Sequence, residues 1–164
     1  LPWLLIGMLG GIGNSMILGN FDTTFAAHPE MALYIPLIGG TGGNVGTQSS
    51  ALVVQGLANS SLDANNTWKQ ILKESVVALI NATIISMLVY IYNFIRFGAT
   101  ATVSYSVSLS LFAVVMFASI FGTLVPMTLE KLKIDPAIAT GPFISITNDI
   151  IGMMLYMGIT VLLS

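Results

Sequence analysis

An aspartate stands in the middle of the last apolar stretch of the chain. Asp149 lies within Ile146–Gly152, and a charged carboxylate at the centre of a membrane helix costs about 2.5–3.5 kcal/mol on insertion scales. Three partners would offset that cost: a bound cation, a proton, or a structural hydrogen bond to a neighbouring helix. No Lys, Arg or His falls at a matching depth in another apolar stretch, so a buried ion pair does not account for Asp149.

A glycine-rich segment interrupts the second apolar stretch. Five glycines lie within residues 39–50, together with polar side chains that include Asn44, Thr47 and Gln48. In one interpretation the glycines form a small-residue face on which two helices pack closely. In the other, the polar side chains and the backbone carbonyls line a water-filled path, because polar backbone at membrane depth is tolerated only against protein or water. The two interpretations are compatible, and both remain open at this stage.

The side chains of these two segments offer oxygen ligands. Asn148 and Thr147 precede Asp149, while Asn44 and Thr47 lie in the glycine-rich segment. Hard divalent cations prefer such oxygen ligands, whereas softer metals prefer His or Cys, and the chain has one histidine and no cysteine. A single carboxylate supplies only one negative charge, which is less than a divalent cation carries. Because homo-oligomers are most often two-fold dimers, a symmetric pair would bring two copies of Asp149 around one path.

Two more acidic residues flank the loop after the fourth apolar stretch. Glu130 and Asp135 are candidate pore-mouth residues that would recruit cations, or simply solvated loop charges.

The composition requires an environment that is mostly lipid. Only 7% of the 164 residues are charged, the mean hydropathy is +0.89, and a soluble domain carries about 25% charged residues to wet its surface. A net charge of −2 excludes a basic patch for nucleic acid. We predict an all-α polytopic membrane protein, a five-helix bundle forming one transmembrane domain over residues 1–164. The five predicted spans are residues 2–20, 31–58, 71–94, 106–129 and 137–163.

The lysines predict an orientation in the cell membrane. Lys69 and Lys73 follow the second span, and Lys131 and Lys133 follow the fourth. Arg96 follows the third span and therefore lies on the other side of the membrane. Since basic residues in short loops favour the cytoplasmic side, we expect the amino terminus inside and the carboxyl terminus outside. The chain begins at Leu1 rather than Met, so we expect it to be part of a longer protein.

The two polar segments resemble the transmembrane domain of the MgtE magnesium channel family. The segment Gly42-Gly-Asn-Val-Gly-Thr-Gln48 is similar to that family's Gly-Gly-Asn-Ala-Gly-Thr-Gln signature. The second match is Asp135-Pro-Ala137, followed by Gly141-Pro142 and by Thr147-Asn-Asp-Ile-Ile-Gly152. Family members usually carry a cytosolic regulatory region ahead of the membrane part, and the 164 residues contain no counterpart of it.

The resemblance implies a homodimeric, Mg²⁺-selective channel in membrane lipid, with a pore lined by the second and fifth spans. Asp149 matches the pore aspartate that binds the largely hydrated ion, and Gly42, Gly43, Asn44 and Thr47 match the glycine-rich pore segment. Mg²⁺ would be both the bound and the transported ion, and other divalent cations remain candidates.

Two other functions are compatible with the residues themselves. A proton- or sodium-coupled carrier would use Asp149 as its titrating site, and a noncatalytic assembly subunit would use the glycines only for helix packing. We do not expect an enzyme, because no nucleophile–base pair can be assembled from these residues.

Overall fold

The computed structural model describes residues 1–98, 102–139 and 141–163, without the side chains of Trp3 and Ala139. Every regular element in these ranges is helical. The α-helices are α1 (Pro2–Gly19), α2 (Asp22–Ala27), α3 (Ile35–Ala58), α4 (Thr67–Phe97), α5 (Thr102–Lys131) and α6 (Pro142–Leu163). Three 3₁₀ helices, η1 (Pro29–Tyr34), η2 (Ala64–Asn66) and η3 (Pro136–Ala139), connect them. The all-helical fold class is therefore confirmed for the described residues.

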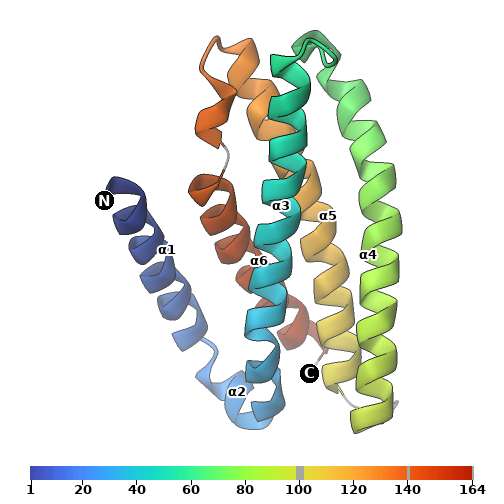
Figure 1. The fold of residues 1–164 in the computed structure, drawn as a ribbon. Coiled ribbons are helices and arrows are strands. Elements are labelled where there is room, and N and C mark those ends of the chain that lie inside the picture. Colours follow the sequence, from blue (N-terminus) through green and yellow to red (C-terminus); the bar gives the residue numbers. More distant parts are fainter. Residues whose placement is uncertain (99–101, 140, 164) are drawn as a thin grey trace.

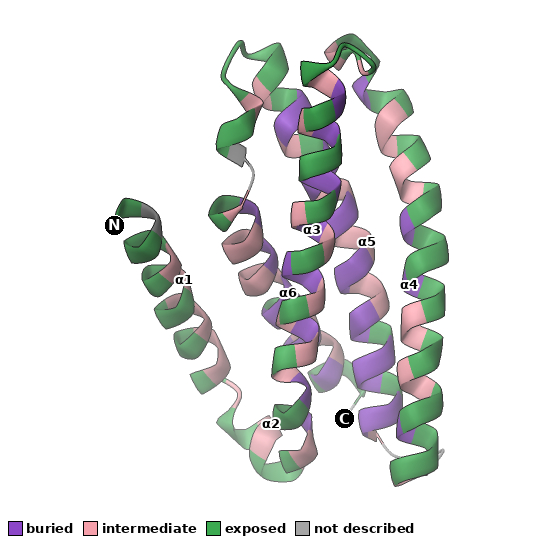
Figure 2. Cartoon of the chain, viewed as in Figure 1, coloured by how far each residue is buried: buried purple, intermediate pink, exposed green. Residues whose placement is uncertain are grey.

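Helix α5 is the centre of the bundle. It contacts α3, α4 and α6, whereas α1 packs against α6 and diverges from the rest (Figure 1). Buried residues follow α5 along most of its length, while α1 and the outer face of α4 are largely exposed (Figure 2). Exposed leucines, isoleucines and valines on those outer faces suit a lipid environment, in which apolar surface carries no penalty.

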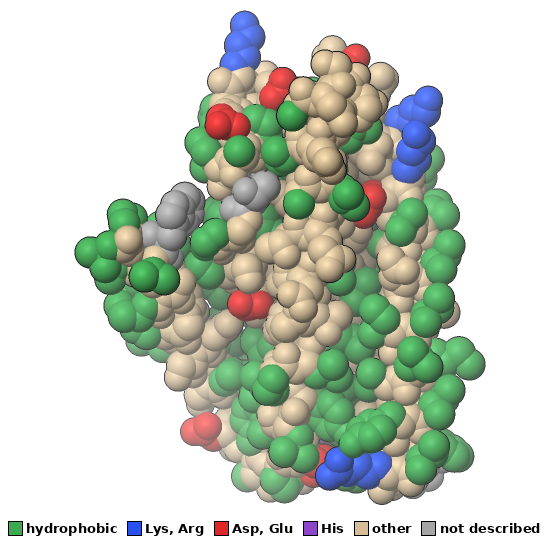
Figure 3. Space-filling model, viewed as in Figure 1, with side chains coloured by type: hydrophobic (Ala, Val, Ile, Leu, Met, Phe, Trp, Pro, Cys, Tyr) green, Lys and Arg blue, Asp and Glu red, His purple; other side chains and the backbone are tan. Residues whose placement is uncertain are grey.

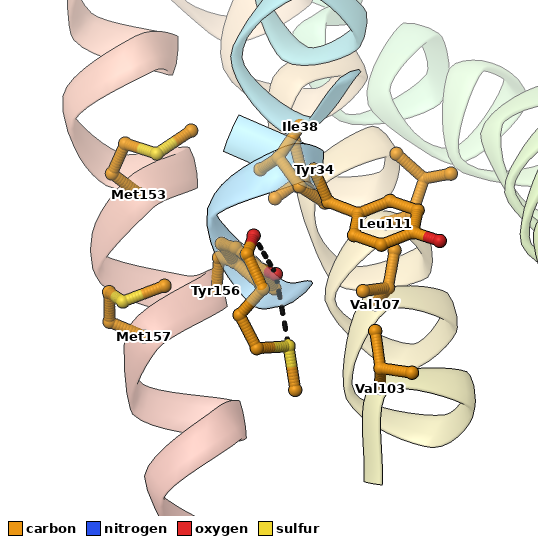
Figure 4. Close-up of a cluster of buried hydrophobic side chains, with 10 residues drawn as sticks. Tyr34, Ile38, Val103, Val107, Leu111, Met153, Tyr156 and Met157 are labelled. Carbon is orange, nitrogen blue, oxygen red and sulfur yellow. Dashed lines mark hydrogen bonds between the residues drawn. The ribbon is translucent and has the colours of Figure 1, made fainter. Parts of the chain in front are cut away.

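The apolar core joins α5 and α6 to the start of α3. Val107 and Leu111 of α5 face Ile38 of α3 and Met157 of α6 (Figure 4). In the same cluster the Tyr156 hydroxyl donates a hydrogen bond to the backbone carbonyl of Met31, 2.8 Å away. A buried tyrosine needs such a partner, and this bond fixes η1 against α6.

Within the part of the chain that the structure describes, three helices are long and apolar enough to span a membrane. They are α4 counted from Ala64, α5 and α6; within the described residues α1 gives only a shorter apolar helix, Leu4–Gly19. Helix α3 has 24 residues, but its glycines and polar side chains make it less hydrophobic than a typical span. The count of five spans therefore remains a prediction.

Two of the predicted spans are divided between helices in the structure, for local reasons. Residues 31–34 belong to η1 rather than to the second span, since Pro29 starts this short helix and Pro36 stands at the start of α3. The fifth predicted span also divides, because η3 covers Pro136–Ala139 and Gly141 has φ +73°. Glycine adopts this left-handed conformation at little cost, and Pro142 then begins α6.

A carboxylate on α4 joins three helices. Glu74 Oε1 accepts hydrogen bonds from Ser49 Oγ of α3 and Ser119 Oγ of α5, each 2.9 Å long. The two hydroxyls are 3.2 Å apart, and both serines are buried. Nothing in the local sequence singles out Glu74, because its partners lie 25 and 45 residues away along the chain.

Replacing Glu74 with alanine should destabilise the bundle. The change leaves two buried hydroxyls without their shared acceptor, which costs about 1–3 kcal/mol. Glu74→Gln should cost less, because its amide oxygen can still accept. Thermal unfolding in detergent measures both, with exposed Glu130→Ala as the control; an equal midpoint for Glu74→Ala and the control would contradict the prediction.

Candidate functional site

A cleft of about 270 Å³ opens between α1, α3 and α6. In the space-filling view the basic side chains stand at the two ends of the molecule, and an acidic side chain is visible midway, beside α1 (Figure 3). Asp149 is the acidic residue that lines the cleft. The complete lining is Asn14, Leu18, Ile35, Pro36, Gly39, Gly40, Gly43, Asn44, Ser145, Asp149 and Met153.

The half-buried Asp149 side chain faces the glycine-rich helix. A methyl group placed at Gly43 would lie 3.3 Å from Asp149 Oδ1, and one at Gly39 would lie 3.7 Å from the same atom. Gly43 therefore leaves space that the carboxylate occupies, and a methyl group at Gly39, one helical turn away on the same face, would lie at ordinary contact distance from it. Within the described part of the chain, Asp149 accepts no hydrogen bond and forms no ion pair. Its charge is open to the cleft.

Other residues of the predicted site lie near Asp149 but differ in surroundings. Asn44 is exposed and lines the cleft. Thr47 is half-buried, and its hydroxyl donates to the carbonyl of Gly43, 2.8 Å away. Gln48 is exposed beyond it and does not line the cleft.

Asn148 points to the side of α6 away from the cleft. It is 1% exposed, and its amide lies against Gly46 of α3. Neither amide atom has a hydrogen-bond partner in the described residues. Gly42 is buried at the same junction, where an added methyl group would lie 2.9 Å from Val114 of α5.

The remaining predicted residues stay apart from the cleft. The Thr147 hydroxyl donates to the carbonyl of Phe143, 2.8 Å away on its own helix. Glu130, near the end of α5, and Asp135, just before η3, are both exposed, and an Asp135 carboxylate oxygen accepts the backbone N–H of Ala137 at 2.9 Å.

The described residues do not bring together a metal site made of acidic side chains. No group of three or more His, Asp or Glu residues comes together among the described residues. The polar side chains of the cleft are one open carboxylate, an exposed amide on α3, the Ser145 hydroxyl of α6 and the amide of Asn14 on α1. This set can attract a cation, but direct coordination would need further ligands or water.

The sequence of this chain matches the MgtE family, described as divalent cation transporters, over residues 35–159. The chain belongs to that family. The match contains all of α3 and most of α6, the helices that carry Gly43, Asn44 and Asp149.

Individual MgtE relatives extend this likeness across nearly the whole chain. A protein of Bacillus subtilis named magnesium transporter MgtE is 33% identical over 159 residues, or 97% of this chain. A protein of the same name from Thermus thermophilus is 32% identical over 161 residues, or 98% of this chain. The chain spans 35% of the length of each of these relatives. Both names describe transporters. Membership of the MgtE family and the apolar helices together identify this chain as a membrane protein.

Two polar side chains that line this MgtE-family cleft were missed in the sequence. Ser145 stands four residues before Asp149, on the same face of α6, and a pattern of i and i+4 polar residues would have found it. Asn14 lies in the first apolar stretch, and only its polarity among hydrophobic neighbours marks it.

Proposed function

We propose that this chain is the membrane domain of a magnesium transporter and that Asp149 holds the ion on its path. The observation that carries the proposal is the unpartnered carboxylate facing the cleft against Gly39 and Gly43. Membership of a divalent cation transporter family and relatives named as magnesium transporters support the choice of ion.

The ion would pass largely hydrated. Mg²⁺ sheds water reluctantly and usually keeps several waters when it binds to protein. Six waters occupy about 180 Å³ at roughly 30 Å³ each, and the cleft measures about 270 Å³. A hydrated ion therefore fits, with its water hydrogens directed at the Asp149 carboxylate and at the amide oxygen of Asn44.

Two copies of the chain would complete the pore. One carboxylate neutralises half of a divalent charge, whereas a two-fold axis beside α3 and α6 supplies a second Asp149. The cleft opens at the surface of the protomer, so a second copy could close it. In this arrangement α1, α3, α4, α5 and α6 cross the membrane, the amino terminus lies inside, and the exposed Glu130 and Asp135 stand at the inner mouth.

Channel-like conduction is part of the proposal, with Asp149 binding the ion rather than carrying a coupled proton. An ion in such a path is driven by its own gradient and by voltage. A carrier coupled to protons or sodium would instead respond to gradients of those ions.

Flux into proteoliposomes tests the proposed function. The purified chain should take up Mg²⁺ down its gradient, faster than Ca²⁺, and at a rate unchanged by an imposed pH or Na⁺ gradient. A rate that follows the pH or Na⁺ gradient would establish the coupled carrier instead. No Mg²⁺ flux through a folded, dimeric protein would mean that these helices alone do not conduct.

A further inference from the structure

We propose that Asn14 of α1 is a further ion-site residue, contacting the water shell of the cation held by Asp149. This inference rests on the proposed function. It makes α1 the third wall of the ion path, beside α3 and α6.

Helix packing brings Asn14 to the level of Asp149. Helix α1 contacts α6, and a methyl group placed at Gly10 would collide with the side chain of Ile146. Asn14 follows Gly10 by one helical turn on the same face, and Asp149 follows Ile146 by nearly one turn. The two helices run in the same general direction, downward in the view of Figure 1, toward the end of the molecule where α2 lies. Both side chains accordingly line the same cleft.

The hydrogen-bonding groups of Asn14 are not used within the protomer. Its Oδ1 atom is buried and has no partner in the described residues. If Asn14 served only to hold α1 against α6, its amide should bond to a group on α6, and the described part of the chain shows no such bond. A buried polar atom left unsatisfied costs about 1–3 kcal/mol, so a rotation of the amide that brings Oδ1 to the cleft is favoured when a hydrogen-bond donor is present there.

The hydrogen-bonding groups that line the cleft determine which kind of ligand it can bind. Asp149 can only accept hydrogen bonds when ionised, and an amide oxygen is also an acceptor. With Oδ1 of Asn14 turned toward the cleft, two acceptors would face one cavity and would attract a species that presents positive charge or hydrogen atoms to both. Water bound to Mg²⁺ does this, because its oxygen faces the metal and its hydrogens face outward. Rotation of the Asn14 amide about its last torsion would present the oxygen to such a shell.

Cysteine labelling tests the position of Asn14 independently of transport. The chain has no cysteine, so Asn14→Cys carries a single thiol. A small cationic methanethiosulfonate should label it in membranes, and millimolar Mg²⁺ should slow labelling several-fold. Ser60→Cys is the labelled control, because Ser60 is exposed in the loop after α3 and does not line the cleft; its labelling should not respond to Mg²⁺. An unlabelled Asn14→Cys, or labelling that ignores Mg²⁺, would overturn the proposal.

Flux measurements separate this inference from the proposed function. Asn14→Leu should lower Mg²⁺ uptake about fivefold, the effect expected for one lost hydrogen bond, while Ser15→Leu conducts like the parent. Asn14→Ser, which is smaller and still polar, should retain more uptake than Asn14→Leu. If the parent conducts and Asp149→Asn does not, yet Asn14→Leu matches Ser15→Leu, the role of Asn14 is refuted and the proposed function stands. If the parent shows no Mg²⁺ flux and Mg²⁺ protects no thiol, the proposed function fails.

Discussion

Replacing Asp149 with asparagine should lower Mg²⁺ uptake by proteoliposomes at least about tenfold, the equivalent of roughly 1.4 kcal/mol of lost binding. The substitution keeps the size of the side chain and removes its charge. Because no described group bonds to this carboxylate, the fold does not depend on the charge. We therefore expect the variant to be expressed, to dimerise and to unfold like the parent, and a radiotracer or fluorescent-indicator uptake assay measures the loss.

Glu130→Gln is the matched control for the Asp149 experiment. It removes one carboxylate of the same charge from an exposed position outside the cleft. If Glu130 were only a solvated loop charge, uptake would be unchanged; a modest loss at low ionic strength would indicate recruitment of cations at the pore mouth. Equal uptake by the parent and Asp149→Asn would show that Asp149 is not an ion site.

Gly46→Ala should destabilise the contact between α3 and α6. The added methyl group would collide with the amide of Asn148 and lie 3.0 Å from Ile144 Cγ2. Both neighbours are at most 1% exposed, so neither has space to move aside. Overpacking of this kind costs about 1–3 kcal/mol, and thermal unfolding in detergent measures it.

Gly40→Ala on the same helix separates steric cost from helix propensity. An added methyl group at Gly40 meets nothing within 4 Å. Alanine favours a helix over glycine by about 1 kcal/mol, so this control should unfold at the parent's temperature or slightly above it. Equal stability of Gly46→Ala and Gly40→Ala would contradict the close packing of α3 on α6.

Much of the candidate site was predictable because its main residues are of types that are unfavourable in an apolar membrane helix. A carboxylate in an apolar stretch and glycines in a span are each costly, and Asp149, Gly43 and Asn44 all line the cleft. The direction of Asn148 was not predictable, since adjacent helical positions differ by about 100° and only the neighbours decide which of them faces the cleft. The ion-site roles themselves remain predictions until flux is measured.

Residues whose partners are distant in the sequence could not be predicted from it. The structural role of Glu74 is visible only in the folded chain, where packing brings Ser49 and Ser119 beside it. Asn14 likewise depends on how α1 docks on α6. The helices were easier to predict than their ends, because hydrophobicity continues through Pro136–Ala139 although Gly141 separates that turn from α6.

The modest hydrophobicity of α3 has a consequence for biosynthesis. Alone, this helix would gain little from entering lipid, and its contacts are with α5 and α6, which leave the ribosome after it. We therefore expect α3 to stay near the translocon, shielded from lipid, until its later partners arrive. The polar character that suits this segment to an ion path also makes its insertion dependent on the rest of the chain, so truncation before α5 should leave α3 a target for quality-control proteases.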